Sequence, residues 1–267
     1  MNFKIIAFNI SRKFYLSFPF MRLQTHEDAY GRNIYDTFVH QKGGYDIVER
    51  EDGHFSLNGD SDAYTEPFDQ WESIQQKAVE SVKGRVLDVG CGGGKHAFHL
   101  QNKGFDVVAM DNSPLALEVC KRRGIQQTWL GSVEDLNSEV GIFDTILMFG
   151  NNFGLLENFD KAHQFFHRAH QFTSDKALIL AETLDPYGIA FDNEDDRVYQ
   201  QENRARGRMT GQVRVRIRYR KYATPWADYL FVSLAEMEDI LKGTGWKIQQ
   251  CLKEPKYDQY IAFIIKD

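Results

Sequence analysis

The chain is poor in cysteine, with only Cys91, Cys120 and Cys251. None of them stands at the spacing of a zinc or redox motif, so the sequence indicates neither a disulfide framework nor a metal site. Long apolar runs are missing too, because no stretch approaches the ~20 apolar residues that a membrane-spanning helix requires. We therefore expect a cytoplasmic protein in a reducing compartment, with no metal and no membrane partner.

An excess of basic residues is also absent. Lysine and arginine number 32 against 38 aspartate and glutamate residues, for a formal net charge of -6. A general nucleic-acid binder needs surplus positive charge to displace the counterions of the phosphate backbone, so this function is disfavoured. With 42% hydrophobic residues, the 267-residue chain can bury one substantial core with small additions. We expect a monomer or a homodimer.

The first twenty residues, MNFKIIAFNISRKFYLSFPF, lack the full pattern of a secretory signal peptide. Asn9, Ser11 and Arg12 interrupt the apolar run, and no small-x-small cleavage pattern follows. This stretch is either an extra element packed on the domain or an extension upstream of a natural start at Met21. The expected organisation is an N-terminal extension and lid region over residues 1–70, followed by the main domain over residues 71–267.

Beyond residue 71, short β-rich runs alternate with helical patterns, which predicts a parallel sheet covered by helices on both faces. Ser113 and Pro114 begin one helix as N-cap and first-turn proline, and Gly124 ends it. The predicted strands are residues 86–89, 105–110, 125–130, 143–149, 177–182, 246–252 and 260–265. The predicted helices are residues 72–82, 114–123, 158–172 and 233–242, with one more between the glycine cluster and Gly104.

Residues 197–222 interrupt this alternation. They are typical of an antiparallel hairpin that turns near residues 207–211 and returns through VRVRIRYR, so we expect an inserted β-hairpin over about 192–230. The alternation places four arginines on one strand face. They form either a solvated face, balanced by DNEDD at residues 192–196 and by Glu202, or a binding surface for an acidic substrate or RNA. The four arginines are Arg214, Arg216, Arg218 and Arg220.

The stretch VLDVGCGGGKHAF, residues 86–98, has a glycine cluster directly after a strand but no complete phosphate-binding signature. A Walker-type loop needs a glycine where Val89 stands and a hydroxyl where His96 stands. A dinucleotide fingerprint that begins at Gly90 needs its third glycine where Lys95 stands. What remains is G-x-G-x-G from Gly90 onward, which allows positive φ and lets a ligand lie directly against the backbone.

Asp111 follows the glycines by about twenty residues, at the end of the next predicted strand. A carboxylate at this place can accept both hydroxyl hydrogens of a ribose, so the ligand is expected to contain one. Asp111 does not by itself distinguish a nicotinamide dinucleotide from S-adenosylmethionine.

Four segments in order, VLDVGCGGG, VVAMDNSPLALEVCKRRG, WLGSVEDL and FDTILMFGN, resemble the class I S-adenosylmethionine-dependent methyltransferases. The resemblance covers residues 71–265, so the main domain is expected to be a methyltransferase domain. It implies an α/β, doubly wound fold with a Rossmann-like, seven-stranded, mostly parallel sheet whose last strand is antiparallel. It also implies S-adenosyl-L-methionine as the cofactor and methyl transfer to a small-molecule acceptor.

The resemblance further implies a cofactor site at the carboxyl ends of the first four strands. Asp88 would order the glycine loop and reach the methionine amino group, while Asp111 with Asn112 would take the ribose hydroxyls. The family often has an aspartate where Ser132 stands, so backbone groups or Glu134 would replace its contact to the adenine. The implied cofactor residues are Asp88, Gly90, Cys91, Gly92, Asp111, Asn112, Ser132, Val133, Glu134, Phe149 and Gly150.

The sequence says less about the acceptor. Methyl transfer needs little beyond in-line placement of the nucleophile and, for some acceptors, removal of a proton, and no residue stands out as catalytic. The turn after the fourth strand lacks the Asn/Asp-Pro-Pro-Tyr pattern of enzymes that methylate nucleobase or glutamine nitrogens. Candidate acceptor residues, whose aromatic members are equally compatible with core packing, are Tyr64, Trp71, Asn151, Trp226 and Tyr229.

Two other functions stay open at the level of sequence. A protein could bind S-adenosylmethionine without transferring its methyl group. An NAD-dependent oxidoreductase would instead place a pyrophosphate near residues 92–95. The glycine turn and Asp111 are compatible with all three functions, so only measurements of ligand binding and turnover distinguish between them.

Overall fold

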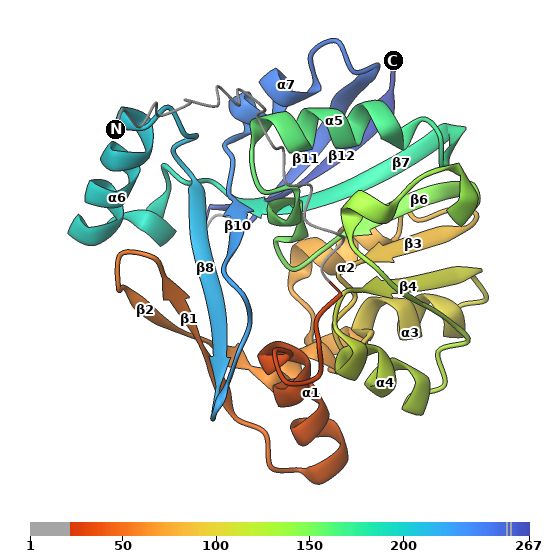
Figure 1. The fold of residues 1–267 in the computed structure, drawn as a ribbon. Helices are drawn as coiled ribbons and strands as arrows, with labels where there is room; N and C mark the ends of the chain where they lie inside the picture. Colours follow the sequence, from red (N-terminus) through yellow and green to blue (C-terminus); the bar gives the residue numbers. More distant parts are fainter. Residues whose placement is uncertain (1–21, 255, 257) are drawn as a thin grey trace, which may run out of the picture.

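The computed structural model describes residues 22–254, 256 and 258–267 (Figure 1). The expectations for residues 1–20 lie outside this part of the chain. A large sheet covered by helices stands beside a smaller sheet, and the two are drawn on the right and left of Figure 1. No helix of the described residues is long and apolar enough to cross a membrane.

The large sheet has seven strands in the order β11-β12-β7-β6-β3-β4-β5. The pairs from β7 to β5 are parallel, whereas β12 is antiparallel to both of its neighbours. The predicted mostly parallel sheet with an antiparallel last strand is therefore confirmed. Its strands are β3 (Val86–Val89), β4 (Val107–Asp111), β5 (Gln127–Leu130), β6 (Phe143–Met148), β7 (Thr173–Leu184), β11 (Trp246–Glu254) and β12 (Gln259–Lys266).

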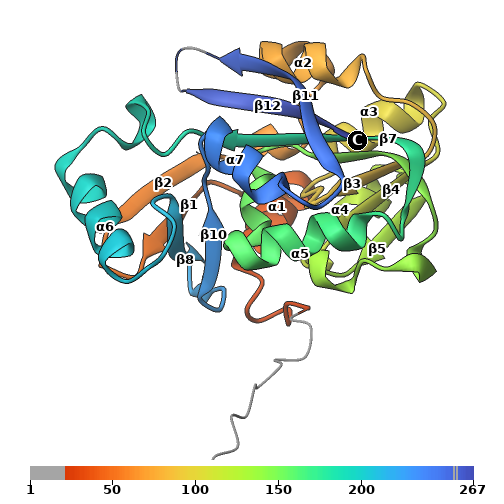
Figure 2. The same ribbon diagram turned by 90° about the horizontal axis from the view of Figure 1, so that it is seen from above.

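Helices cover both faces of this sheet (Figure 2). Alternate strand residues point to opposite faces, so each strand feeds two cores. Val86 and Ala109 belong to the core beneath α2, α3 and α4, while their neighbours Leu87 and Met110 belong to the core beneath α5 and α7. The helices are α2 (Ser73–Val79), α3 (Lys95–Asn102), α4 (Pro114–Arg122), α5 (Phe159–Ala169) and α7 (Leu234–Leu241).

The smaller sheet, which we call the β-lobe, joins two segments that are far apart in the chain. Its order is β10-β8-β1-β2 with β9 beside β8, and every pair is antiparallel. Helix α1 (Ala29–His40) packs against β8 and against α4. The strands of the β-lobe are β1 (Tyr45–Arg50), β2 (Phe55–Asp60), β8 (Gln212–Tyr219), β9 (Tyr222–Ala223) and β10 (Ala227–Leu230).

The predicted hairpin over residues 197–222 was wrong in its first arm, which is helix α6 (Glu194–Ala205). Asn193 caps this helix by accepting a hydrogen bond from the backbone N–H of Asp196, and acidic residues fill its first turn, where they stabilise the helix dipole. The hairpin within residues 192–230 is instead formed by β8 and β10.

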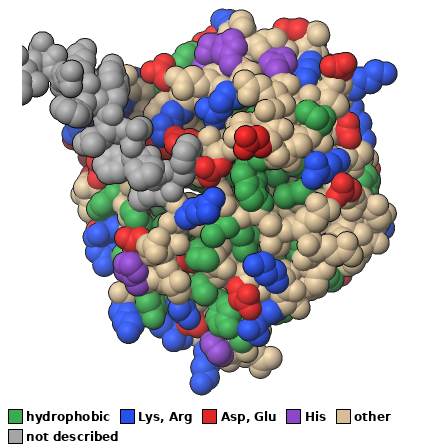
Figure 3. Space-filling view, turned by 45° about the vertical axis from the view of Figure 1, so that its right-hand side comes forward, with side chains coloured by type: hydrophobic (Ala, Val, Ile, Leu, Met, Phe, Trp, Pro, Cys, Tyr) green, Lys and Arg blue, Asp and Glu red, His purple; other side chains and the backbone are tan. Residues whose placement is uncertain are grey.

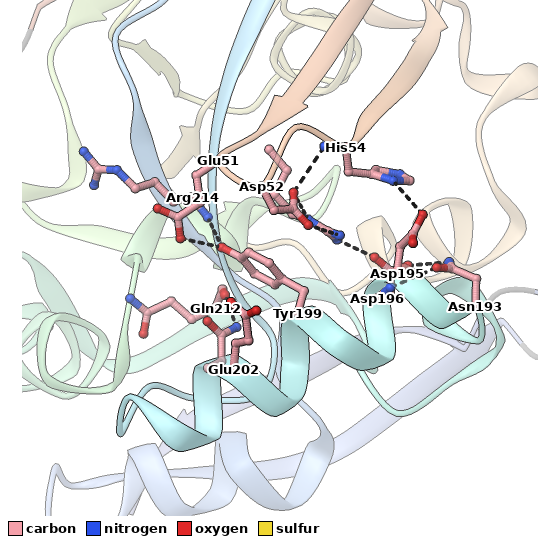
Figure 4. A network of polar contacts seen from close by, with 12 residues as sticks. Glu51, Asp52, His54, Asn193, Asp195, Asp196, Tyr199, Glu202, Gln212 and Arg214 are labelled. Atoms are coloured by element: carbon pink, nitrogen blue, oxygen red, sulfur yellow. Dashed lines mark hydrogen bonds and ion pairs between the residues drawn. The ribbon is translucent and has the colours of Figure 1, made fainter.

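Helix α6 is held against the β-lobe by polar contacts (Figure 4). The Tyr199 hydroxyl donates to a carboxylate oxygen of Glu51 at 3.0 Å and accepts the backbone N–H of Arg214 at 3.2 Å. Asp196 pairs with Arg50 of β1. These contacts tie α6, β1 and β8 together, so the insertion and the N-terminal strands form one structural unit.

Candidate functional site

The glycine turn between β3 and α3 requires its glycines. Gly90, Gly92 and Gly94 have φ of 70, 53 and 75°, a region that side-chain-bearing residues rarely adopt. A Cβ atom on Gly90 would stand 2.6 Å from Nδ2 of Asn152. The turn is thus packed closely from the side of the loop that follows β6.

Two buried aspartates hold this turn. Asp111, at the end of β4, accepts the backbone N–H of Gly92 at 2.9 Å through one carboxylate oxygen and that of Ser113 at 2.9 Å through the other. Asp88 accepts the backbone N–H of Ala97 at 3.1 Å in the first turn of α3. Burial raises the pKa of Asp88 to about 7 and that of Asp111 to about 6, because a charged carboxylate loses its hydration there.

The loop after β5 lies beside Asp111, since the backbone N–H of Gly131 donates to the Asp111 carbonyl at 3.0 Å. Ser132 donates its backbone N–H to Asp135 at 2.8 Å and closes a capping box there. Val133 is buried, whereas Glu134 is exposed and pairs with Lys161 at 2.6 Å. The Glu134 carboxylate is therefore paired at the surface, and that of Asp135 is occupied by the turn itself.

The loop after β6 reaches the glycine turn from the other side. The Asn152 amide donates to the carbonyls of Val89 and Gly90 at 2.8 and 2.9 Å. Asn151 has a φ of 63°, and its carbonyl accepts the Tyr229 hydroxyl at 2.5 Å. The Asn151 side-chain oxygen is buried without a hydrogen-bond partner among the described residues. An unpaired buried oxygen at this point is available to a donor on a bound molecule.

The structure brings Tyr64 to the glycine turn and Tyr229 to Asn151 in the loop after β6. A Cβ atom on Gly92 would lie 3.2 Å from the Tyr64 ring and 3.0 Å from the Tyr30 hydroxyl. Burial raises the pKa of Tyr229, and the charge of Glu182 raises it further. Tyr229 comes from β10, Tyr30 from α1 and Tyr64 from the segment between β2 and α2.

The two candidate tryptophans have other neighbours. Trp71 is only 4% exposed, packs edge-to-face against Phe68 and His96, and donates its indole N–H to the Glu66 carbonyl at 3.3 Å. Trp226 lies 4.6 Å from the guanidinium of Arg216 in the β-lobe. Both have packing roles in the structure, which the sequence had left open.

The remaining predicted residues flank the turn. The Cys91 thiol is buried 3.8 Å from the thiol of Cys120 in α4, and Phe149 is buried edge-on to His96. Gly150 has a φ of 72° and Asn112 is exposed at the rim beside Asp111.

Sequence reasoning missed Tyr30 and Glu182. Tyr30 packs edge-to-face on Tyr64 with ring centroids 5.0 Å apart. Its helix α1 is fixed because Asp28 accepts the Ser113 hydroxyl at 2.8 Å and the backbone N–H of Leu115 at 3.1 Å. No local pattern in the sequence links residue 28 to residue 113, so this contact could not be predicted from the sequence.

Glu182 did carry a signal, because it is an acid near the carboxyl end of an apolar strand, as Asp88 and Asp111 are. It is fully buried and accepts the backbone N–H of Gly150 at 2.7 Å and the amide of Gln75 at 2.8 Å. Burial raises the pKa of Glu182 to about 7. Acids at the ends of β3, β4 and β7 thus surround the point where the β6 loop meets the glycine turn.

The arginines of β8 are paired with acids other than those expected. Arg216 and Arg218 share Glu49 of β1, and Arg214 pairs with Asp228 at 3.1 Å. The expectation that residues 192–196 and Glu202 balance them was wrong, since Asp196 pairs with Arg50 and Glu202 with Arg206. On the face drawn in Figure 3, acidic and basic side chains are interspersed rather than gathered by sign.

The residues of the site fit a cationic, phosphate-free cofactor better than a dinucleotide. Lys95 and Arg123, the cations next to the turn, are engaged: Lys95 pairs with Glu66 at 2.9 Å, and Arg123 donates to the carbonyls of Gly93 and Thr65. A pyrophosphate would need such groups or free backbone donors, whereas buried carboxylates favour positive charge.

Comparison with known proteins supports this assignment. The methyltransferase domain family matches residues 86–175. Two curated relatives are named as methyltransferases. The one from Geobacillus sp. (strain WCH70) is 27% identical to this chain over 129 residues, and the one from Bacillus subtilis is 24% identical over 128 residues. These matches cover 45% and 46% of this chain and 52% and 51% of the relatives. The chain thus spans about half the length of the curated relatives it matches.

A solved S-adenosylmethionine-dependent methyltransferase from Bacteroides fragilis, in complex with S-adenosyl-L-homocysteine, is similar over most of both chains. It is 26% identical, with a TM-score of 0.77, and the match covers 91% of this chain and 97% of that one. A methyltransferase from Clostridium acetobutylicum, 14% identical with a TM-score of 0.53 over 88% and 97% of the two chains, shares the fold. Together with the sheet order and the ordered motifs, these findings support a class I S-adenosylmethionine-dependent methyltransferase.

Proposed function

We propose that the protein transfers the methyl group of S-adenosylmethionine to a small-molecule acceptor. The observation that carries this proposal is the convergence of Asp111, the glycine turn and the loop after β6 through direct hydrogen bonds. In support of the proposal, these three features lie at the carboxyl ends of the parallel strands, where open α/β sheets bind ligands.

Asp88, the turn from Gly90 to Gly92 and Asp111 with Asn112 are the residues proposed to hold the cofactor, with residues 132–134 beside its adenine. When bound, S-adenosylmethionine supplies an electrophilic methyl group. Phe149 and Gly150 border the place where acceptor and cofactor would meet. The chain's own contribution is to orient both molecules and to exclude water, which can account for a large part of the rate of a bimolecular reaction.

Tyr64, Tyr229 and Asn151 are proposed to contact the acceptor, with Tyr30 beside them. Three phenol rings and a buried amide oxygen suit a neutral or cationic molecule that donates a hydrogen bond. The arginines of β8 are already paired with acids, so they do not favour an acidic acceptor.

The domain arrangement follows from this site. We propose that residues 71–267 form the methyltransferase domain and that the chain before residue 71 supplies its lid, with β1 and β2 completing the β-lobe around the insertion. We further propose a cytoplasmic monomer or homodimer.

Ligand titration tests the proposal. S-adenosylhomocysteine should bind the wild-type protein and NAD should not, and Asp111→Ala should weaken the binding of S-adenosylhomocysteine about 100-fold through loss of buried charge-assisted hydrogen bonds. Asp106→Ala, which removes an exposed acid paired with Arg85, is the matched control and should bind normally. Tight NAD binding with none of the homocysteine compound would refute the assignment.

A panel of small amines, phenols and thiols, followed by release of S-adenosylhomocysteine, then separates a transferase from a protein that only binds the cofactor. Turnover with any acceptor supports the transferase, whereas binding without turnover across the panel supports the binding protein.

A further inference from the structure

Glu182 is the buried acid of the site that no predicted cofactor contact uses. Its carboxylate accepts hydrogen bonds from the backbone N–H of Gly150 and from the amides of Gln75 and Gln259. All three donors are neutral, and no ion pair to Glu182 exists among the described residues. A fully buried carboxylate with only neutral donors is poorly compensated, so a cation that enters next to it is stabilised.

Glu182 contacts the loop after β6, which borders the proposed meeting place of cofactor and acceptor. Gly150 follows β6 directly, and the next residue, Asn151, receives the Tyr229 hydroxyl. Glu182 also acts electrostatically on Tyr229. The charge of Glu182 is therefore linked by one hydrogen bond to the loop that separates the proposed cofactor and acceptor places.

Four other titratable groups are linked to Glu182 by charge or through a hydrogen-bond partner. Lys95 acts on it from the start of α3 but is paired with Glu66, and Glu72 acts on it from the residue before α2. His96 reaches Glu182 only through Gln75, and burial lowers the pKa of His96 well below its usual range, so this imidazole is neutral at pH 7. Tyr229 is neutral as well, because its pKa is raised.

We propose that Glu182 is a positioning residue whose negative charge makes the site prefer the sulfonium cofactor to its neutral thioether product, an inference that rests on the proposed methyltransferase function. Methyl transfer removes the positive charge, because the bonding pair of the broken S–CH₃ bond stays on sulfur while the lone pair of the acceptor forms the new bond. An acceptor proton leaves to solvent. Because the site binds the sulfonium cofactor more tightly than the neutral thioether product, the product is released more readily after transfer.

Two stable probes differ in this charge. Sinefungin carries an ammonium group near the position of the sulfonium, and S-adenosylhomocysteine is neutral there. We expect Glu182→Gln to reduce the preference for sinefungin over S-adenosylhomocysteine about tenfold, as loss of one charge at low effective dielectric constant predicts. Binding of S-adenosylhomocysteine should stay within about threefold of wild type, because the Gln side chain can still accept the Gly150 hydrogen bond.

Glu182→Asp and Glu80→Gln are the matched variants. Glu182→Asp keeps the charge and should keep the preference for sinefungin. Glu80→Gln removes an exposed acid at the end of α2 whose charge does not act on Glu182, and should leave the preference unchanged. An equal loss of affinity for both probes in Glu182→Gln would show a purely structural role and overturn the proposal.

Proton release gives a readout that needs no variant. The pKa of Glu182 is about 7, so a cation that binds beside it should lower this pKa and release a proton near pH 7. Calorimetry of the wild-type protein in two buffers of different ionisation enthalpy should detect this release for sinefungin and not for S-adenosylhomocysteine. No difference between the probes overturns the proposal even if Glu182→Gln fails to fold, while failure of both probes to bind instead refutes the methyltransferase function.

Discussion

The two halves of the site are built in opposite ways. The proposed cofactor half lies mostly between residues 86 and 134, where strand, turn and helix follow one another and Asp88 and Asp111 stand near the ends of β3 and β4. The β-lobe joins β1 to β8, so that Glu49 meets Arg216 across 167 positions of the chain. A site formed by residues close in sequence can be recognised as a motif. A surface formed by strands far apart in sequence shows only the alternation of polar and apolar residues within each strand.

The halves also differ in how they treat charge. In the cofactor half the acids are buried with backbone donors, and burial raises the pKa values of Asp88 and Asp111. In the β-lobe, hydrogen bonds from Arg216 and Arg218 lower the pKa of Glu49 to about 2. The buried carboxylates of the first arrangement would be stabilised by a positively charged ligand. The charge of Glu49 in the second is already neutralised by arginines.

The largest expected effect concerns the close packing of the cofactor half. Gly94→Val should lower the free energy of unfolding by about 3 kcal/mol, from strain at positive φ and from overpacking. The φ of Gly94 is 75°, and a Cβ atom there would stand 2.4 Å from Ile125 and 2.8 Å from Cys120. Urea denaturation measures the change.

Gly104→Ala is the control for that variant. Gly104 has a φ of 92° but no atom within 4 Å of an added Cβ, so only the backbone strain of about 1 kcal/mol remains. Equal losses in the two variants would contradict the claim that packing around the glycine turn limits substitution.

The next effect is the pH dependence of stability without ligand. The folded pKa values of Asp88 and Asp111 exceed those of free aspartate, so protonation favours the folded state. The stability from these groups is fully present below about pH 4 and is lost as the pH rises through 6 to 7. Asp88→Asn should flatten this decline in denaturation experiments between pH 5 and pH 7.

The pKa of Glu49 is shifted in the opposite direction to those of Asp88 and Asp111, so Glu49→Gln is a useful comparison. Its lowered pKa contributes stability above about pH 4.5 that is lost as the pH falls toward 2. Glu49→Gln should therefore leave the slope between pH 5 and pH 7 unaltered. A change of that slope in Glu49→Gln would mean that the two halves are coupled electrostatically.

The same contrast explains what the sequence could predict. The glycine spacing, Asp111 and the Ser233 capping box are local signals, and the strands and helices around them form as expected. The prediction of a strand in the region of α6 was wrong. The acidic first turn of α6 and its cap at Asn193 were the signals that favoured a helix.

The acceptor wall was less predictable for a physical reason. Tyr64 and Trp71 are aromatic residues before the same helix, and composition does not say which one faces a ligand. Their surroundings differ, because Trp71 is enclosed by Phe68 and His96 while Tyr64 packs on Tyr30 over Gly92. Tyr30 belongs to a helix whose anchor, Asp28, bonds to residues 85 and 87 positions away.

The smallest expected effect tests the contact between the halves. Tyr229→Phe removes the hydroxyl that donates to the Asn151 carbonyl, and should lower the free energy of unfolding by about 1 kcal/mol. Because this hydrogen bond fixes the loop beside the proposed acceptor place, turnover with an acceptor from the panel should also fall, while binding of S-adenosylhomocysteine should not change.

Tyr199→Phe is the control for Tyr229→Phe, because it also removes a hydrogen-bonded tyrosine hydroxyl but at a different place in the fold. The Tyr199 hydroxyl is likewise buried and bonded, to Glu51 and to the backbone of Arg214, within the β-lobe and α6. Both variants should lose similar stability, but only Tyr229→Phe should lose turnover. If Tyr199→Phe slowed turnover as much, the β-lobe would act as one rigid wall, and the acceptor place would depend on its overall stability rather than on the hydrogen bond to Asn151.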